Sequence, residues 1–97
     1  MSIKESKLQN ISESLKAVAH PDRIRILKFL AENKETKKSV SKICVQLKLK
    51  QPEVSRHLSI LKNKEVVQFQ RGGNNIYYSV NKNSFVFSCI QSLIKSI

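Results

Sequence analysis

Apolar residues recur at helical spacing in four segments of the first two thirds of the chain. The apolar positions of the first segment are Leu8, Ile11, Leu15 and Val18 or Ala19. They predict an amphipathic helix that ends at His20-Pro21, because proline disfavours helical geometry in the residue before it. Proline is favourable in a first turn, so Pro21 is expected to begin a second helix that ends near Asn33. The apolar residues of the second helix are Ile24, Ile26, Leu27, Leu30 and Ala31.

The next two helices have the lengths of a helix-turn-helix over about residues 39–63. A polar and basic segment, NKETKK, precedes them and is expected to be a loop. Ser39 is the expected N-cap of a short third helix, and the apolar residues of that helix are Val40, Ile43, Cys44 and Leu47. The fourth helix is expected to start at Gln51 with Pro52 in its first turn, and its buried stripe is Val54, Leu58 and Leu61.

Beyond Glu65 the apolar period changes from the helical value to two. Apolar and polar residues alternate on both sides of RGGNN, which holds the only two glycines of the chain. This pattern predicts a β-hairpin over about residues 66–80. Helical spacing returns over residues 83–97. The predicted fold is therefore mostly α with one hairpin, in the order α-α-α-α-β-β-α, which is a winged helix-turn-helix.

The last helix is apolar over most of its circumference. Its apolar residues are Phe85, Val86, Phe87, Cys89, Ile90, Leu93, Ile94 and Ile97. A chain of 97 residues builds one small domain, here residues 1–97, and its core cannot cover so wide a face. The last helix is therefore expected to offer a surface to a partner.

The charge of the chain points to polyanionic partners. Eighteen Lys and Arg residues against seven Asp and Glu residues give a net charge of +11 and a sequence pI near 10.0. Nucleic acid and anionic membrane surfaces are the usual partners of such a field, whereas a merely solvated surface would mix charges more evenly. No apolar run approaches the ~20 residues that would span a bilayer, and no signal peptide is visible. A cytoplasmic protein without a membrane contact is expected.

The polar side of the fourth helix has residue types that suit the major groove of DNA. Gln51, Ser55, Ser59 and Lys62 fall within one arc, with Pro52 and Arg56 beside them. Arg pairs with guanine and Gln with adenine, while serine contacts bases or phosphates. A solvated helix face would instead prefer Glu and Lys, which are stronger helix formers.

Other residues complete the predicted DNA contacts. His57 points toward the apolar flank, so it either packs there or contacts a phosphate at the edge. Arg71, Asn74 and Asn75 at the hairpin tip would enter a minor groove or contact a phosphate. Lysines flank the fourth helix as phosphate contacts would; they are Lys37, Lys38, Lys42, Lys48, Lys50 and Lys64.

Three segments of the chain, over about residues 8–81, resemble the ArsR/SmtB family of small prokaryotic winged-helix repressors. They are LKAVAHPDRIRILKFL, SVSKICVQLKLKQPEVSRHLSILKNKEVV and RGGNNIYYSV. The resemblance implies a homodimer paired through the first and last helices, about residues 6–19 and 83–97. It also implies binding to a palindromic operator in double-stranded DNA and release by an inducer, which it does not identify.

The chain departs from the sensing sites of that family. Metal sensors of the family carry Cys-x-Cys where this chain has Ser39 and Ser41, and residues 83–97 contain no Asp, Glu or His. Neither a metal nor another cofactor is therefore expected. Redox sensors of the family use one cysteine in the second helix, where this chain has Lys28, and one in the last. Cys44 and Cys89 are candidates for a thiol switch, and structural packing is the alternative for both. Cys89 would also permit a disulfide with its symmetry mate.

Two interpretations of the whole chain differ in class. One is a dimeric, sequence-specific DNA-binding repressor, with thiol-responsive repression as a variant of it. The other is a winged-helix protein-interaction module, in which the apolar last helix docks on another protein and the basic surface is incidental. An enzyme is not expected, because the chain has no glycine-rich phosphate loop, carboxylate pair or nucleophile-base spacing.

Overall fold

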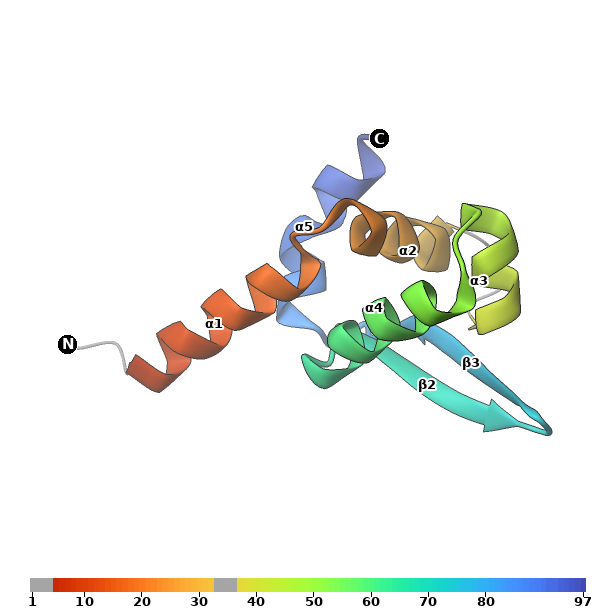
Figure 1. Ribbon diagram of the computed structural model, residues 1–97. Helices are drawn as coiled ribbons and strands as arrows, with labels where there is room; N and C mark the ends of the chain where they lie inside the picture. Colours follow the sequence, from red (N-terminus) through yellow and green to blue (C-terminus); the bar gives the residue numbers. More distant parts are fainter. Residues whose placement is uncertain (1–4, 33–36) are drawn as a thin grey trace.

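The computed structural model describes residues 5–32 and 37–97 (Figure 1). The elements in chain order are α1 (Glu5–Val18), α2 (Pro21–Glu32), β1 (Lys38–Ser39), α3 (Val40–Leu47), α4 (Gln51–Asn63), β2 (Val67–Gly72), β3 (Asn75–Val80) and α5 (Phe85–Lys95). This order confirms the predicted winged helix-turn-helix and adds one short strand. The predicted end of the second helix near Asn33 and most of the NKETKK loop lie outside the described residues.

Side chains of the predicted type begin the helices. Ser39 caps α3, and its hydroxyl oxygen accepts a hydrogen bond from the Lys42 backbone N–H at 3.2 Å. Ser84 caps α5 in the same way, accepting from the Phe87 N–H at 3.1 Å. Pro52 lies in the first turn of α4, where its missing N–H costs no intrahelical bond. Lys48 ends α3 with a left-handed backbone at φ +57°, so that the chain turns into α4.

The core lies between α2, α3, α4 and the base of the hairpin. Its fully buried side chains are Ile26, Leu27, Ile43, Val54, Leu58, Leu61 and Val66. Val86, Phe87 and Ile94 add one side of α5 to the same cluster. The predicted stripe of α4 is thus buried along its whole length, and the opposite side of α4 faces outward.

The sheet has three strands in the order β1-β3-β2, where a two-stranded hairpin was expected. In β1, Lys38 pairs with Tyr78 and Ser39 pairs with Tyr77. Lys38 is only 1% exposed, and its ammonium lies 3.4 Å from the Leu30 carbonyl oxygen and 4.9 Å from the centre of the Phe29 ring. The prediction of a loop was therefore wrong at Lys38, which lies in a strand. The prediction that Lys38 contacts a phosphate was also wrong, because its side chain is buried.

The hairpin forms the predicted wing. Its pairs run from Val67 with Val80 to Gly72 with Asn75, and Gly73 and Asn74 make the turn. Gly73 has φ +62°, a backbone that glycine adopts without steric cost. Arg71 lies within β2 opposite Ile76, and the pair Gly72 with Asn75 separates it from the turn.

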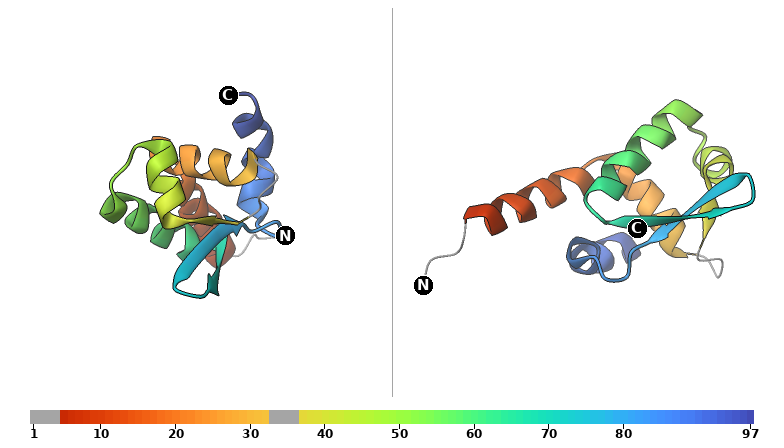
Figure 2. Two further views of the ribbon diagram at one scale, coloured as in Figure 1. Left: turned by 90° about the vertical axis from the view of Figure 1, so that its right-hand side faces the viewer. Right: turned by 90° about the horizontal axis from the view of Figure 1, so that it is seen from below.

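α1 projects from the body of the molecule, and α5 packs beside its base (Figures 1 and 2). The two helices and the end of the chain after α5 leave a set of large apolar side chains exposed: Leu8, Ile11, Leu15, Phe85, Leu93 and Ile97. Exposed apolar side chains, predicted for the last helix, are therefore present there and also occur on the first helix. None of the helices in the described part of the chain is long and apolar enough to cross a membrane.

Candidate nucleic-acid interface

The outward side of α4 carries the residues predicted to contact DNA. Five of them are exposed: Gln51, Pro52, Ser55, Arg56 and Ser59. Lys62 is half-buried, and its ammonium lies 4.7 Å from the centre of the Phe69 ring in β2. That cation–π contact ties the end of α4 to the wing. The exposed residues of α4 thus form a polar face that includes Arg56, whereas Lys62 of the predicted arc is less accessible.

The wing begins beside α4, which contacts β2, and its tip projects away from the body of the molecule (Figures 1 and 2). Arg71, Asn74 and Asn75 are all exposed on it. The Asn75 amide donates a hydrogen bond to the Tyr77 hydroxyl at 3.4 Å, which is a long contact. The predicted contacts of helix and wing are therefore exposed on two neighbouring elements.

The flanking lysines differ in their surroundings. Lys37, Lys42, Lys48 and Lys50 are exposed. The Lys37 ammonium donates to the Gln70 amide oxygen at 3.2 Å, which places it beside the wing. Lys64 is half-buried and lies 2.7 Å from a carboxylate oxygen of Glu13, and this contact lowers the pKa of Glu13. The Lys64–Glu13 ion pair joins α4 to α1, so Lys64 is the least available of the predicted phosphate contacts outside the buried Lys38.

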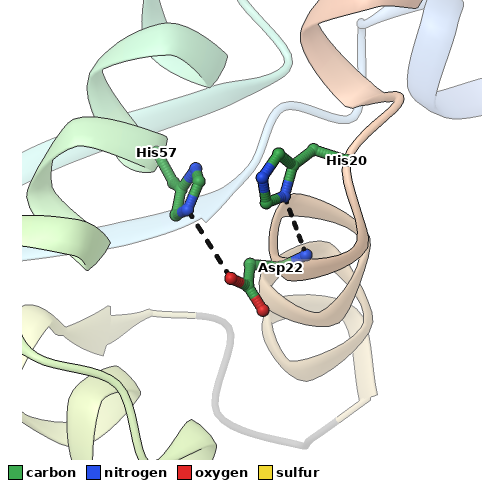
Figure 3. A group of neighbouring side chains, drawn as sticks. All are labelled: His20, Asp22 and His57. Atoms are coloured by element: carbon green, nitrogen blue, oxygen red, sulfur yellow. Dashed lines mark hydrogen bonds and ion pairs between the residues drawn. The ribbon is translucent and has the colours of Figure 1, made fainter.

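His57 is buried, as the packing alternative predicted, and does not belong to the exposed face of α4. Its side chain meets His20 and Asp22 at the start of α2 (Figure 3). Burial lowers the pKa of His57, and the positive charge that His20 and Arg23 can carry adds to the effect. Both effects favour the neutral imidazole over the charged one. A phosphate contact by His57 does not fit this position.

Two arginines of α2 hold neighbouring segments in place, and sequence reasoning missed both. Arg25 donates to the Leu47 carbonyl oxygen at the end of α3 at 2.9 Å and to the Asp22 carboxylate at 3.1 Å. Arg23 donates to the Ala17 carbonyl oxygen at 2.9 Å, near the end of α1. The Arg25 contact fixes the last turn of α3, and with it the entry into α4. Only the apolar spacing of α2 was visible in the sequence, and spacing says nothing about these partners.

The two cysteines lie on different elements and are both free thiols. Cys44 is half-buried on α3 and packs against the core, which agrees with its packing alternative. Cys89 is exposed on α5. Ser39 and Ser41, at the positions of the metal-binding cysteines in the resembled family, are a half-buried helix cap and an exposed residue.

Fold and surface together define a winged helix-turn-helix protein of the DNA-binding type. Residues 20–68 match the model of the family described as "Bacterial regulatory protein, arsR family". The chain belongs to this family, whose members are transcriptional regulators and not enzymes.

Known relatives agree in sequence and in structure. An uncharacterized HTH-type transcriptional regulator of Methanocaldococcus jannaschii is 42% identical over 76 residues, which is 77% of this chain and 83% of that protein. The transcriptional repressor PagR of Bacillus anthracis is 39% identical over 79 residues, covering 81% and 77% of the two chains. Its crystal structure superimposes with a TM-score of 0.74 and covers 96% of this chain and 98% of PagR. HlyU of Vibrio cholerae gives a TM-score of 0.80 at 26% identity, covering 96% and 97%.

Proposed function

We propose that the protein is a dimeric repressor that binds a specific, palindromic site in double-stranded DNA and occludes the promoter in the cytoplasm. The face of α4 would enter the major groove, where Gln51, Ser55, Arg56 and Ser59 contact base edges. The wing would contact the adjacent backbone or minor groove through Arg71, Asn74 and Asn75.

The distribution of charge around α4 carries this proposal. Residues 37–64 contain eight Lys and Arg residues and a single acidic residue, Glu53. Glu53 is half-buried in the first turn of α4, where the helix dipole favours a carboxylate. A basic surface around an exposed helix rich in Gln, Ser and Arg matches the electrostatic and chemical demands of duplex DNA.

Two further observations support the parts of the proposal that concern partners. PagR is named a transcriptional repressor, as is the Bacillus subtilis relative SdpR, which is 38% identical over 66 residues. The exposed apolar side chains of α1 and α5 supply a surface for pairing two copies. Two-fold symmetry would place two α4 helices about one DNA turn apart, which requires a palindromic site.

The proposal is tested by selecting bound duplexes from a random pool and then titrating binding against salt. We expect a palindromic consensus and a steep linear fall of log K with log salt, because each neutralised phosphate releases counterions. The protein-interaction alternative has no need of DNA. Weak binding without a consensus, or an affinity indifferent to salt, would favour that alternative and contradict repression by sequence-specific binding.

A further inference from the structure

The chain has only two histidines, and the fold brings them together. His20 lies just before α2 and His57 lies in the middle of α4, yet the centres of their rings are 4.7 Å apart. Asp22, in the first turn of α2, lies beside both (Figure 3). One ligand atom from each of the three residues lies within 4.8 Å of the others. Two imidazoles and a carboxylate, far apart in the sequence, thus converge on one point between α2 and α4.

The nitrogens of His57 are poorly satisfied by the surrounding protein. His57 is 7% exposed, and its Nδ1 is buried without a hydrogen-bond partner among the described residues. Its Nε2 lies 3.8 Å from Oδ2 of Asp22, which is longer than a hydrogen bond. Buried polar groups are nearly always satisfied, and an unsatisfied one calls for an explanation such as a role in binding an ion.

The carboxylate of Asp22 is already oriented toward His57. Arg25 donates to Oδ1 at 3.1 Å, which fixes the carboxylate and leaves Oδ2 on the side of the imidazole. Partners of this kind orient metal ligands in known sites. His20 and Asp22 are each half-buried, so the cluster is reachable from solvent, which would supply a water ligand. Three protein ligands and one water complete a four-coordinate site.

We infer that His20, Asp22 and His57 form a binding site for a divalent transition metal ion of the zinc type. Imidazole nitrogens suit zinc, cobalt and nickel, whereas magnesium and calcium prefer sites made of oxygen alone. A tetrahedral zinc site with bonds of ~2.1 Å places its ligand atoms ~3.4 Å apart. The ligand atoms, now within 4.8 Å of one another, would therefore have to close by up to about 1.4 Å, which small changes of rotamer provide.

Metal binding at His20 also replaces an existing contact. Nδ1 of His20 now accepts a hydrogen bond from the Asp22 backbone N–H at 3.1 Å, so this imidazole serves as a cap for α2. When a ring nitrogen of His20 binds the metal, the ring gives up or weakens this cap. The metal–ligand bonds then take over the connection between the start of α2 and α4. This inference concerns the metal alone and does not depend on DNA binding.

The site is tested with Co²⁺ as a visible probe and Zn²⁺ as its competitor. The protein is made without a histidine tag and stripped with a chelator, and the Co²⁺ absorption bands are then titrated. We expect one Co²⁺ per chain, displaced by one equivalent of Zn²⁺. By NMR, Zn²⁺ should shift the imidazole signals of both histidines together, since the chain has no other histidine.

Variants separate this site from other ligands. His20→Gln and Asp22→Asn should each lower the Co²⁺ affinity by more than about a hundredfold, since losing even an outer partner of a ligand costs about 10–100-fold. Glu32→Gln, which removes another carboxylate of α2, should leave it unchanged. The Cys44→Ser, Cys89→Ser double variant removes both thiols and should keep the bands. Circular dichroism verifies folding, and His20 and Asp22 are the half-buried ligands whose replacement leaves the core intact.

Three results would overturn the inference. The first is wild-type protein that binds no stoichiometric Co²⁺ or Zn²⁺. The second is an unchanged affinity in folded His20→Gln and Asp22→Asn. The third is loss of the bands in the double cysteine variant, which would assign the ion to the thiols.

Discussion

Arg56 is the residue of the α4 face with the strongest capacity to distinguish bases. It is exposed beside Ser55 and Ser59, and a guanidinium can bond to both acceptors of a guanine edge. If Arg56 contacts a base in this way, Arg56→Ala should weaken binding to the selected site by about 1–3 kcal/mol and relax preference at one position. Fluorescence anisotropy on the selected duplex and its single-base variants measures both effects.

The matched control for Arg56→Ala is Lys95→Ala, at the end of α5, which lowers the net charge equally but lies away from α4. It should reduce binding only slightly and to the same extent on all duplexes. A uniform loss on every duplex in Arg56→Ala would make Arg56 a phosphate contact and would contradict base recognition by this residue.

Arg25 acts on the interface without belonging to it, because it fixes the end of α3 to α2. Arg25→Met keeps most of the aliphatic stem but removes the bond to the Leu47 carbonyl oxygen and the bond to Asp22. We expect the free energy of unfolding to fall by about 1–2 kcal/mol, since a charged donor to a carbonyl is worth more than a neutral one but Arg25 is half in solvent. Urea denaturation followed by circular dichroism gives this value.

Lys28→Met provides the comparison for Arg25→Met on the same helix. Lys28 makes an ion pair with Glu32 at 2.8 Å, four residues along, and such pairs contribute only about 0.3–0.5 kcal/mol. An equal loss in the two variants would show that the Arg25 contacts do not hold the helix-turn-helix.

At the scale of elements, the apolar period predicted the helices and the hairpin because each is long enough to repeat its pattern. The α4 stripe of Val54, Leu58 and Leu61 is buried along its whole length, so the polar arc opposite it could be assigned in advance. β1 could not be predicted, since two residues cannot show an alternation. Lys38 is buried there because the strand pairing places it beside Tyr78, and no local signal in a basic segment indicates that.

The contacts between elements could not be predicted from the sequence either. His57 was placed correctly on the apolar flank of α4, but its partners come from the start of α2. The meeting of His20, Asp22 and His57 follows from the packing of α2 against α4 and has no spacing motif. Arg25 likewise finds its partner at the far end of α3. Periodicity predicts which side of a helix is buried, whereas the identity of the neighbour depends on how the helices cross.

The turn of the wing can be tested by substitutions at Gly73. Gly73 has φ +62° and open space where a side chain would lie, so only backbone strain opposes a substitution. Gly73→Ala should lower the free energy of unfolding by about 1 kcal/mol. Gly73→Asn should cost clearly less, because asparagine adopts the left-handed region more readily. Urea denaturation measures both costs. Equal costs for the two variants would contradict the view that left-handed backbone strain at Gly73 determines the loss of stability.

On the scale of the whole molecule, the basic surface and the apolar surface lie on different elements. Basic residues surround α4 and the wing, whereas exposed apolar side chains gather on α1 and α5. Pairing through α1 and α5, as proposed, would therefore leave both α4 helices of a dimer free to bind one duplex. Once one copy has bound its half-site, the second copy is held near the other half-site at a high effective concentration. The dimer therefore binds the full site more tightly than one copy binds a half-site.

Leu93 allows a test of whether α5 forms the contact between two copies, because it is 69% exposed on that helix. Leu93→Glu would bury an unpaired carboxylate between the two copies, and such burial costs several kcal/mol. We expect analytical ultracentrifugation to give a monomer where the unchanged protein is a dimer. The affinity for the full palindrome should fall at least about a hundredfold, toward that for a single half-site, because the second α4 no longer binds intramolecularly.

Val45→Glu is the matched control, since Val45 is 79% exposed on α3 and lies outside the α1 and α5 surface. It introduces the same charge in place of an exposed apolar residue and should leave the sedimentation of the dimer unchanged. A Leu93→Glu protein that sediments like the unchanged one would place the contact between copies elsewhere. Leu93→Glu could instead give a monomer that still binds the palindrome more tightly than the half-site, as the unchanged protein does. That result would show that pairing of the two copies plays no part in DNA binding.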